Sequence, residues 1–556
     1  MLLRQGDPLL PEAEAYAPGR IDAHQQAQAF GSGNDYLAYL PLPRGSQNSD
    51  RGVLFCNHEN CYPGLQFAPQ AKGYTRTQAA AERAAVGASV VELRREGERW
   101  EVVSGSSLAR RITGETPMAI GGPAAGSPRL ATTADPTAER ILGMLGNCAG
   151  GVTPWGTVLT AEENAPDFFM GKPTGEADPA EVRSIGRLGF NYTEHAWGRF
   201  EPRFDLAREP REANRFGWIV EIDPYDPTST PIKRTALGRF RHEGANTTVC
   251  PDGRVAVYMG DDTRGEYLYR FVTAQAWDPS DLAANRDLLD QGTLSVARFE
   301  PDGRLTWRDL VFGAGPLTPD NHFTSQADVV IEARRAADLL GATPLDRAED
   351  VEVQPGTGRV YAALTNNSRR GQHWPTDPAN PRPANAHGHV LELTPPPVGP
   401  DAAPDHTAAE FRWNVFLLAG DPRSEAHGAT VHADTTRHGW FSCPDNLAFD
   451  SSGRLWIATD GNEAVNGRAD GLFACDTDGE GRALTRHFLS VPVGAEACGP
   501  CFTPDGTTLF VSIQHPGARA GATYDNPSTR WPDFQADFPP RDAVIAVRRT
   551  DGEAIG

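Results

Sequence analysis

The sequence predicts an all-β fold, a six-bladed β-propeller with long insertions and a few short helices. The 556 residues include 57 glycines and 46 prolines, a share well above that of an average chain. Hydrophobic residues make up 39% of the chain and aromatic residues are plentiful, so the turns belong to a folded rather than a disordered chain. A short phrase of turn, strand and polar residues also recurs six times, which is typical of repeated β-hairpins.

Each copy of the phrase joins a turn cluster, a short run of β-forming residues and polar residues at the far end. Asp-Gly and Gly-rich pairs tolerate positive φ, so each copy predicts an antiparallel hairpin. The turns are Arg51-Gly52, Pro154-Trp155-Gly156, Pro251-Asp252-Gly253, Gly356-Thr357-Gly358, Ser452-Gly453 and Pro504-Asp505-Gly506. The copies start roughly 50 to 105 residues apart, whereas a propeller blade needs about 40–50 residues. Most blades should therefore carry insertions.

Two insertions have a distinct character. Residues 326–340 read QADVVIEARRAADLL and predict a helix that ends at Gly341. Residues 376–404 are rich in Pro and Asn and predict an irregular loop. No linker divides the chain, so we expect residues 1–556 to form one domain, with the propeller over roughly 35–547 and no separate second domain. A pair of β-sandwiches is the alternative architecture.

The charge balance excludes some classes of partner. A net charge of −21 repels nucleic acid and anionic membrane surfaces, so no nucleic-acid binding is expected. Only three lysines are present, so nearly all cationic side chains are arginines. No apolar stretch approaches the 18 residues of a membrane span, and the start of the chain lacks a secretory signal. The protein is then either cytoplasmic or has lost its export signal.

Potential metal ligands stand at the start of the incoming strand in five of the six copies: Cys148, Glu243, Glu349, Asp445 and Glu496. In a propeller the first strand of each blade lines the central channel, so equivalent positions face one another. Clustered carboxylates and a thiol would repel one another as anions unless cations lay between them. Glu163 would add another carboxylate. The alternatives are a small buried thiol for Cys148 and turn or cap roles for single acids.

Three further residues are candidates for the same site. Arg347 stands two residues before Glu349 and could bind an anion with two hydrogen bonds, or form a surface ion pair with Asp350. Asn164 could donate its amide to the same anion, or cap a turn. Glu59 ends the first outgoing strand and could be a further ligand, or it could be an ordinary polar residue at the edge of the sheet.

Several long segments resemble the PhoX-type alkaline phosphatases. Residues 147–164 read NCAGGVTPWGTVLTAEEN, similar to the family's N-C-A-x-G-x-T-P-W-G-T-x-L-T-C-E-E-N. Further matches are FCNHEN at 55–60, FGWIVEIDPYDPTSTPIKRTALGRFRHEGA at 216–245, YMGDDTRGEYLYRF at 258–271, RAEDVE at 347–352, PDNLAFDSSGRLWIATDG at 444–461 and GPCFTPDGTTLFVSIQHPG at 499–517. The resemblance runs from about 35 to 547. The chain departs from the family at Ala161, where a second cysteine is usual, at Ala348, usually a proline, and at Cys443 and Cys498.

The resemblance implies a six-bladed propeller with a mixed iron (Fe³⁺) and calcium (Ca²⁺) centre in its channel. By motif position, the metal ligands would be Cys148, Glu163, Glu243, Glu349 and Asp445. Arg347 and Asn164 would contact the phosphate, and small-molecule phosphomonoesters would be the substrates. Family members act outside the cytoplasm after twin-arginine export, so a periplasmic or extracellular location is expected, with the signal absent from this sequence.

Two other functions fit parts of the pattern. A calcium-dependent propeller hydrolase, of the lactonase or phytase-like kind, would share the acidic channel but would not explain Cys148. A non-catalytic binding propeller would need no convergent ligands. The sequence therefore favours an alkaline phosphatase, with Glu59 and Glu496 as additional candidate ligands.

Overall fold

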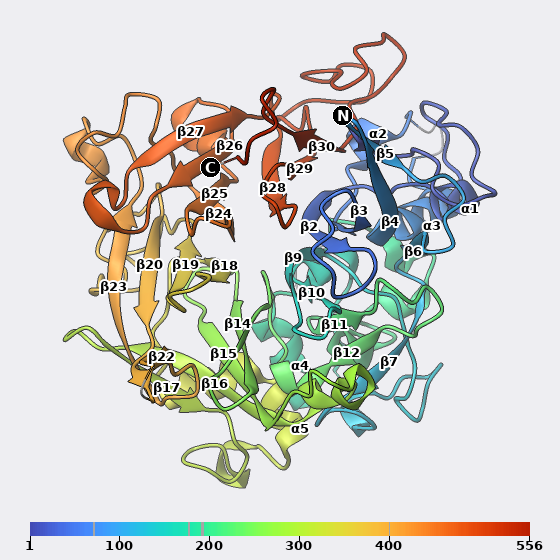
Figure 1. Ribbon diagram of the computed structural model, residues 1–556. Helices are drawn as coiled ribbons and strands as arrows, with labels where there is room; N and C mark the ends of the chain where they lie inside the picture. Colours follow the sequence, from blue (N-terminus) through green and yellow to red (C-terminus); the bar gives the residue numbers. More distant parts are fainter. Residues whose placement is uncertain (70–72, 176–177, 191–193, 400, 556) are drawn as a thin grey trace.

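The structure is a computed structural model, and it describes residues 1–69, 73–175, 178–190, 194–399 and 401–555. Strands dominate, and the helices are short: α1 (Ala23–Gln26), α2 (Pro63–Gln66), α3 (Arg76–Ala85), α4 (Pro179–Arg187), α5 (Gln326–Ile331), α6 (Ala333–Leu340) and α7 (Asn462–Asn466). The predicted β-rich fold class is thus confirmed. Figure 1 shows the sheets arranged around the centre of the molecule.

All six predicted hairpins form, each between an inner strand and a second strand that runs antiparallel to it. The pairs are β2 (Asn34–Pro41) with β3 (Arg51–His58), β9 (Asn147–Val152) with β10 (Val158–Glu162), β13 (Asn246–Val249) with β14 (Arg254–Gly260), β18 (Ala348–Val353) with β19 (Val360–Leu364), β24 (Pro444–Phe449) with β25 (Leu455–Thr459), and β28 (Glu496–Phe502) with β29 (Leu509–Gln514). The turn between β13 and β14 needs a glycine, because Gly253 has a φ of 82°.

The inner strands pack against one another in a closed ring. β2 lies beside β9, β9 beside β13, and so on through β18, β24 and β28 back to β2. These strands surround the centre of the view in Figure 1. The end of the chain meets its beginning here, because β1 (Leu3–Arg4) pairs with β30 (Ala543–Val547) in the same sheet as β28 and β29.

Further strands extend the hairpins outward. They are β4 (Gly87–Glu96), β5 (Arg99–Val102) and β6 (Arg110–Ile112); β11 (Ile219–Ile222), β12 (Ile232–Arg234), β7 (Pro117–Gly121) and β8 (Ile141–Leu142); β15 (Leu268–Ala276), β16 (Gly292–Phe299) and β17 (Arg304–Asp309); β20 (His389–Thr394) and β23 (Glu410–Leu418); and β26 (Gly471–Cys475) and β27 (Thr485–Ser490). Pairing of β17 with β23 joins the strands β13–β17 and the strands β18, β19, β20 and β23 into one nine-stranded sheet.

Both faces of a sheet are covered, which explains why its strands read as nearly continuous hydrophobic runs. Along β14, Val255, Val257 and Met259 pack into one apolar cluster. The alternating residues Ala256 and Tyr258 pack into another cluster on the opposite face. Successive side chains of a strand point to opposite faces, so one strand contributes to two cores. Burial on both sides holds the sheets in place around the ring.

The two predicted insertions differ from expectation in detail. The helix predicted over 326–340 is broken at Glu332 into α5 and α6, where the Glu332 carboxylate binds Arg129 at 2.8 Å. Its end is as predicted, because Gly341 closes α6 with a φ of 69°. The loop predicted over 376–404 contains β20 and the short strands β21 (Pro397–Val398) and β22 (Ala403–Pro404). The alternating run HVLELT forms β20 despite the Pro-rich surroundings, since β19 and β23 flank it on both sides.

Candidate metal centre

Acidic and thiol side chains from all the hairpins gather in the middle of the ring. The inner strands carry Asp35 on β2, Cys148 on β9, Glu349 on β18, Asp445 on β24, and Glu496 and Cys498 on β28. Glu243 precedes β13, and Glu59, Glu163 and Asp262 follow β3, β10 and β14. All of these residues are buried, with at most 8% of their surface exposed.

Their potential ligand atoms form four overlapping groups, and within each group all atoms lie within 4.8 Å of one another. The groups are Asp35–Glu496–Cys498, Asp35–Glu59–Cys148, Cys148–Glu163–Glu243 and Glu243–Asp262–Glu349. Shared members link the groups into a row. Six predicted ligands therefore come together in this row. Asp445 belongs to none of these groups, but its pKa is raised by burial and then by the nearby charges of Glu349 and Glu496.

Cys148 lies where two of the groups meet. Its Sγ atom is 3.2 Å from Glu243 Oε1 and 3.4 Å from Asp35 Oδ2. Burial, followed by the charges of these two carboxylates, raises the pKa of the thiol well above its ordinary value. Without a cation the group is a neutral thiol that donates to a carboxylate. A bound cation would instead favour the thiolate, which is the form that ligates metals.

Irregularities in strand pairing orient three of the acids on the inner strands. The pairing register shifts between Asn34 and Leu37 in β2, between Ala348 and Val351 in β18, and between Pro444 and Leu447 in β24. Asp35, Glu349 and Asp445 each stand just inside such a shift. A β-bulge bends the strand and redirects side chains, and bulges are frequent beside functional sites. A β-bulge at the same position thus orients an equivalent acid in three different sheets.

The electrostatics of the cluster favour positive ions. Burial and mutual repulsion raise the pKa of Glu163, Glu243 and Glu349 well above the ordinary value, and they raise that of Asp35 to about 8. Among the described residues, the guanidinium groups in contact with the set are those of Arg241 and Arg347, and the imidazole of His515 lies beside Glu496. The two guanidinium groups carry fewer positive charges than the ionised carboxylates would carry negative charges. Buried anions without partners are costly.

The donor set suits a cluster of hard cations. Carboxylate oxygens predominate, as calcium and ferric iron prefer, and the thiol of Cys148 would favour iron at its position. Asp35 Oδ1 is buried and has no hydrogen-bond partner among the described residues, so a ligand position is free there. The residues present therefore fit bound metal ions.

Arg347 stands at the edge of the cluster, and its own backbone has a φ of 60°. Its Nε and Nη2 atoms donate to the two oxygens of Asp262 at 2.7 and 2.6 Å, and Nη2 lies 3.1 Å from Glu349 Oε1. These contacts outweigh the burial of Asp262 and lower its pKa. The alternative of an ion pair with Asp350 is wrong, because the guanidinium pairs with Asp262 and Glu349, while the Asp350 carboxylate accepts from the backbone N–H of Leu447 at 3.0 Å.

Asn164 also lies beside the cluster. Its Nδ2 atom donates to Glu59 Oε1 and to Glu163 Oε2, at 2.6 Å each. The turn-cap alternative is wrong, because the side chain makes no cap hydrogen bond to the short 3₁₀ helix Ala165–Phe168 that follows it. The amide instead joins the end of β3 to the end of β10.

Two amide side chains and one histidine hold other members of the set. Gln514 Nε2 donates to Asp35 Oδ2 at 3.0 Å and to Glu59 Oε2 at 3.2 Å. Asn446 Nδ2 lies 3.3 Å from Glu243 Oε1. His515 Nε2 lies 3.1 Å from Glu496 Oε1. The predicted residue Glu496 thus meets Asp35 on one side and a histidine on the other.

The sequence reasoning did not select Asp35, Asp262 or Cys498 as ligands. Asp262 belongs to the polar end of the third phrase, but the neighbouring Asp261 was an equal choice. In the structure Asp261 turns away and binds Arg334, with Nε to Oδ2 at 2.8 Å. Asp35 precedes the first turn by a full strand, yet it occupies the register of Asp445. That equivalence was the available signal.

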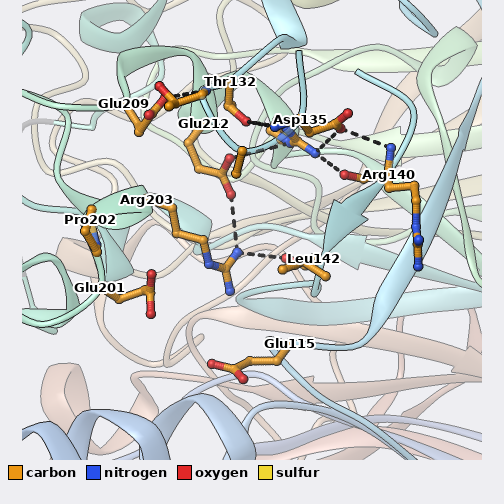
Figure 2. Close-up of a pocket in the computed structure, with 13 residues that line it drawn as sticks. Glu115, Thr132, Asp135, Arg140, Leu142, Glu201, Pro202, Arg203, Glu209 and Glu212 are labelled. Carbon is orange, nitrogen blue, oxygen red and sulfur yellow. Dashed lines mark hydrogen bonds and ion pairs between the residues drawn. The ribbon is translucent and has the colours of Figure 1, made fainter. Parts of the chain in front are cut away.

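A separate cavity of about 630 Å³ lies away from this centre and is lined by none of its residues (Figure 2). Arg203 Nη1 donates there to the carbonyl oxygen of Leu142 at 2.9 Å and to Glu212 Oε1 at 3.3 Å. Arg215 Nη2 donates to Asp135 Oδ2 at 2.8 Å. These two guanidinium groups are thus already paired with acids.

Comparisons with known proteins agree on one family. A family model described as alkaline phosphatase PhoX matches residues 1–517. The solved structure of Pseudomonas fluorescens PhoX in complex with vanadate, a transition state analogue, is 38% identical, covers 100% of this chain and 95% of its own, and superimposes with a TM-score of 0.89. Among curated proteins, none matches this chain.

Two other solved structures are much less similar. A protein of unknown function from Dyadobacter fermentans is 9% identical, with 94% of this chain and 97% of that chain covered and a TM-score of 0.36. A putative oxidoreductase (glucose dehydrogenase) from Thermus thermophilus is 14% identical, with 79% and 82% covered and a TM-score of 0.24. Similarity this weak says nothing about function.

The described part of the chain contains no helix that is long and apolar enough to cross a membrane. The family match extends over nearly the whole sequence, and the likeness to a solved member extends over all of it. This chain belongs to the PhoX family of alkaline phosphatases.

Proposed function

We propose that this protein hydrolyses phosphate monoesters at a centre of ferric iron and calcium ions held in the middle of the ring. The observation that carries the proposal is the row of buried acids joined by Cys148, which leaves negative charge that cations would balance. The ligands would be Cys148, Glu163, Glu243, Glu349 and Asp445, with Glu59 and Glu496 beside them. The vanadate bound to the Pseudomonas fluorescens protein supports a phosphoryl-transfer site in the family.

The fold would serve this site as a six-bladed propeller in one domain over residues 1–556. The closed ring of six inner strands supports that architecture. Each blade would contribute ligands from the start of its first strand or the end of its second. We place the enzyme outside the cytoplasm, where family members act on small phosphomonoesters. Cell fractionation of the native protein tests this location.

Bound cations would supply an activated water or oxide nucleophile and neutralise the phosphoryl oxygens in the transition state. The side chains of the protein have complementary tasks. Arg347 is already held by Asp262 and Glu349, so its guanidinium is fixed at the edge of the cluster before substrate arrives. Its Nη1 atom makes no hydrogen bond to the described residues and can donate to a phosphate oxygen. A guanidinium stays protonated at any alkaline pH at which the enzyme works.

Asn164 and Arg347 are connected through the carboxylates between them. Asn164 contacts Glu163, whose carboxyl group lies within hydrogen-bond reach of Asp262, the partner of Arg347. A phosphate bound between the two donors would therefore meet a positive and a neutral group on a preorganised frame. Such fixed donors need no rearrangement during reaction, which is how charge developing in a transition state is stabilised.

The test combines p-nitrophenyl phosphate hydrolysis with elemental analysis of the same sample. We expect activity together with iron and calcium, and a visible colour from thiolate bound to ferric iron. Cys148→Ser should lose the colour, most of the iron and the activity, because a neutral hydroxyl is a poor substitute for thiolate. Cys475→Ser, a change of a buried thiol in β26, is the matched control and should keep all three.

Other outcomes would point elsewhere. A colourless, iron-free and active protein would leave an all-calcium centre, as in a calcium-dependent propeller hydrolase. Metal binding without any hydrolysis would indicate a binding propeller. If Cys148→Ser matches the wild type in metal content and activity, the thiol is only a buried core residue and the proposed ligand set is wrong.

A further inference from the structure

A second group of potential ligands lies outside the central row, beneath the insertion that follows β10. It consists of Cys61, just after β3, Glu82 on α3, and His195, which precedes the 3₁₀ helix Trp197–Arg199. One ligand atom from each lies within 4.8 Å of the other two. His195 Nδ1 is 3.3 Å from Glu82 Oε2 and 4.0 Å from Cys61 Sγ. All three residues are buried, with at most 3% exposed.

The hydrogen bonds around His195 fix the protonation of one ring nitrogen. Its Nε2 atom lies 2.8 Å from Asn60 Oδ1, and the backbone N–H of Cys61 donates to that same oxygen at 2.8 Å. The atom of Asn60 is therefore an acceptor, so Nε2 carries a hydrogen. The other nitrogen, Nδ1, then points its lone pair at the carboxylate of Glu82. Two electron pairs facing each other at this distance need a cation between them.

The cation between Nδ1 and Glu82 is either a proton or a metal ion. A proton would need only these two groups and would leave Cys61 Sγ, 4.0 Å from Nδ1, as a weak hydrogen-bonding neighbour of the ring. A metal ion would use all three. A histidine that binds a metal through one nitrogen usually donates its other N–H to an oxygen acceptor, as His195 does to Asn60. The thiol and this hydrogen bond together favour the metal.

The surroundings of Glu82 orient its carboxylate for such a role. Tyr74 Oη and Trp197 Nε1 donate to Oε2 at 2.6 and 2.8 Å, and Gln78 Nε2 donates to Oε1 at 3.0 Å. The ring of Phe168 stacks on His195 with centroids 4.9 Å apart and an angle of 15°. Hydrogen-bonded ligands under an apolar cover are typical of metal sites in proteins.

We propose that Cys61, Glu82 and His195 bind a zinc ion that is distinct from the central cluster. Thiolate, imidazole and carboxylate are the ligands of zinc, and a water molecule would complete a tetrahedral set. With bonds of about 2.0–2.2 Å, tetrahedral zinc separates its nitrogen and oxygen ligands by about 3.3–3.5 Å. The 3.3 Å between Nδ1 and Oε2 fits this edge. The sulfur-to-nitrogen edge would be about 3.6 Å, so the 4.0 Å observed requires only a small movement.

Such an ion would connect three different segments of the chain. Cys61 comes from the segment after β3, Glu82 from α3, and His195 from the insertion between β10 and β11. Asn60, which holds the histidine, directly follows Glu59 of the central cluster. The role assigned to the zinc is therefore structural, joining the insertion to the ring next to the candidate active site.

The experiment loads the intact metal-containing protein with Zn²⁺, removes loose ions by gel filtration, and measures zinc per chain. Cys61→Ser and His195→Gln should each hold about one zinc ion less than the wild type. Cys148→Ser should keep that zinc, which separates the site from the central cluster. Cys475→Ser, another buried thiol, is the control for loss of a cysteine in general. Anomalous scattering from crystals at the zinc edge should place the ion between Cys61 and His195.

Equal zinc in the wild type and in folded Cys61→Ser and His195→Gln would overturn the proposal. If these variants do not fold, Co²⁺ replaces Zn²⁺ in chains that retain Cys61. A near-ultraviolet thiolate-to-cobalt absorption band must then persist in Cys148→Ser/Cys498→Ser, which lacks both thiols of the central cluster. Absence of that band would equally show that Cys61 binds no metal. Phosphatase activity is recorded separately, so failure of the zinc site leaves the proposed function standing.

Discussion

The buried ion pair between Lys233 and Glu162 offers a sharp test of how the site is supported. Both side chains are fully buried, and Lys233 Nζ lies 2.7 Å from Glu162 Oε1. Glu162 ends β10 and immediately precedes Glu163 and Asn164, so its anchoring fixes the strand end that carries two candidate site residues. The perturbation is Lys233→Met, which removes the ammonium group and keeps most of the apolar stem.

The magnitude follows from what Glu162 retains. Its carboxylate would still accept hydrogen bonds from the backbone N–H groups of Leu145, Gly217 and Trp218, at 3.1 Å each. Although fully buried, it would nevertheless lose the one cationic side chain that pairs with it among the described residues. Removing one partner of a buried ion pair typically costs about 3–5 kcal/mol, because the other charge is left uncompensated. We expect the free energy of unfolding to fall by that amount.

A double change separates the stranded charge from the lost contact. Burial lowers the pKa of Lys233 to about 8 and raises that of Glu162, so desolvation shifts both partners toward their neutral forms. Replacing both with uncharged residues should then be far milder than replacing one. Lys233→Met/Glu162→Gln should recover most of the stability lost in Lys233→Met.

The assay is urea unfolding at pH 7, with kcat/KM for p-nitrophenyl phosphate measured on the same preparations. Arg549→Met removes an exposed partner of Asp551 and should change neither quantity. Lys233→Met should lower kcat/KM as well, since the end of β10 loses its anchor. If Lys233→Met unfolds within about 1 kcal/mol of the wild type, or the double variant is no better than the single one, the reasoning from buried charge is refuted.

Three further predictions concern the site and the pH dependence of stability. Arg347→Ala should lower kcat/KM for phosphomonoesters by about 10- to 150-fold, the effect of losing charge-assisted hydrogen bonds worth about 1.5–3 kcal/mol, with Arg347→Lys intermediate; an unchanged kcat/KM would place the phosphate clamp elsewhere. Exhaustive EGTA treatment should abolish activity and added calcium should restore it, and full activity after dialysis would contradict the calcium assignment. Burial lowers the pKa of His389 to about 4, below the 6.5 of an unfolded chain, so this residue makes stability fall as the pH drops from about 6.5 to 4. His389→Gln should reduce that loss by about 3 kcal/mol in urea unfolding, and an unchanged pH profile would mean that the ring is not neutral in the fold.

The sequence predicted the hairpins well because their signals are local. Glycine at a turn and β-forming residues beside it act within a few positions, and all six hairpins formed where they were expected. The strand β20 was missed for the opposite reason. Its run HVLELT is short and stands in Pro-rich surroundings, so its pairing with β19 and β23 decides its structure. Such pairing depends on residues distant in the sequence.

The acids of the centre show a different limit. Asp261 and Asp262 are adjacent, have the same chemistry and directly follow the same strand, yet one binds Arg334 and the other binds Arg347. Neighbouring side chains of an extended chain point to opposite sides, so a shift of one residue would exchange their roles. The sequence gives both acids but does not choose between them. The register of β14 against its neighbours makes that choice.

Asp35 shares a local feature with two of the predicted ligands, Glu349 and Asp445. In β18 and β24 an acid is followed two residues later by Val351 or Leu447, and the register shift lies between the residue before the acid and that hydrophobic residue. In β2, Asp35 precedes Leu37 at the same spacing, with the same shift. The hydrophobic residue must pack into the sheet on the far side of the bulge, so the acid two positions earlier is turned toward the centre. The bulge, rather than the turn that follows, is therefore the feature that Glu349 and Asp445 share, and in the first hairpin the acid at that place is Asp35.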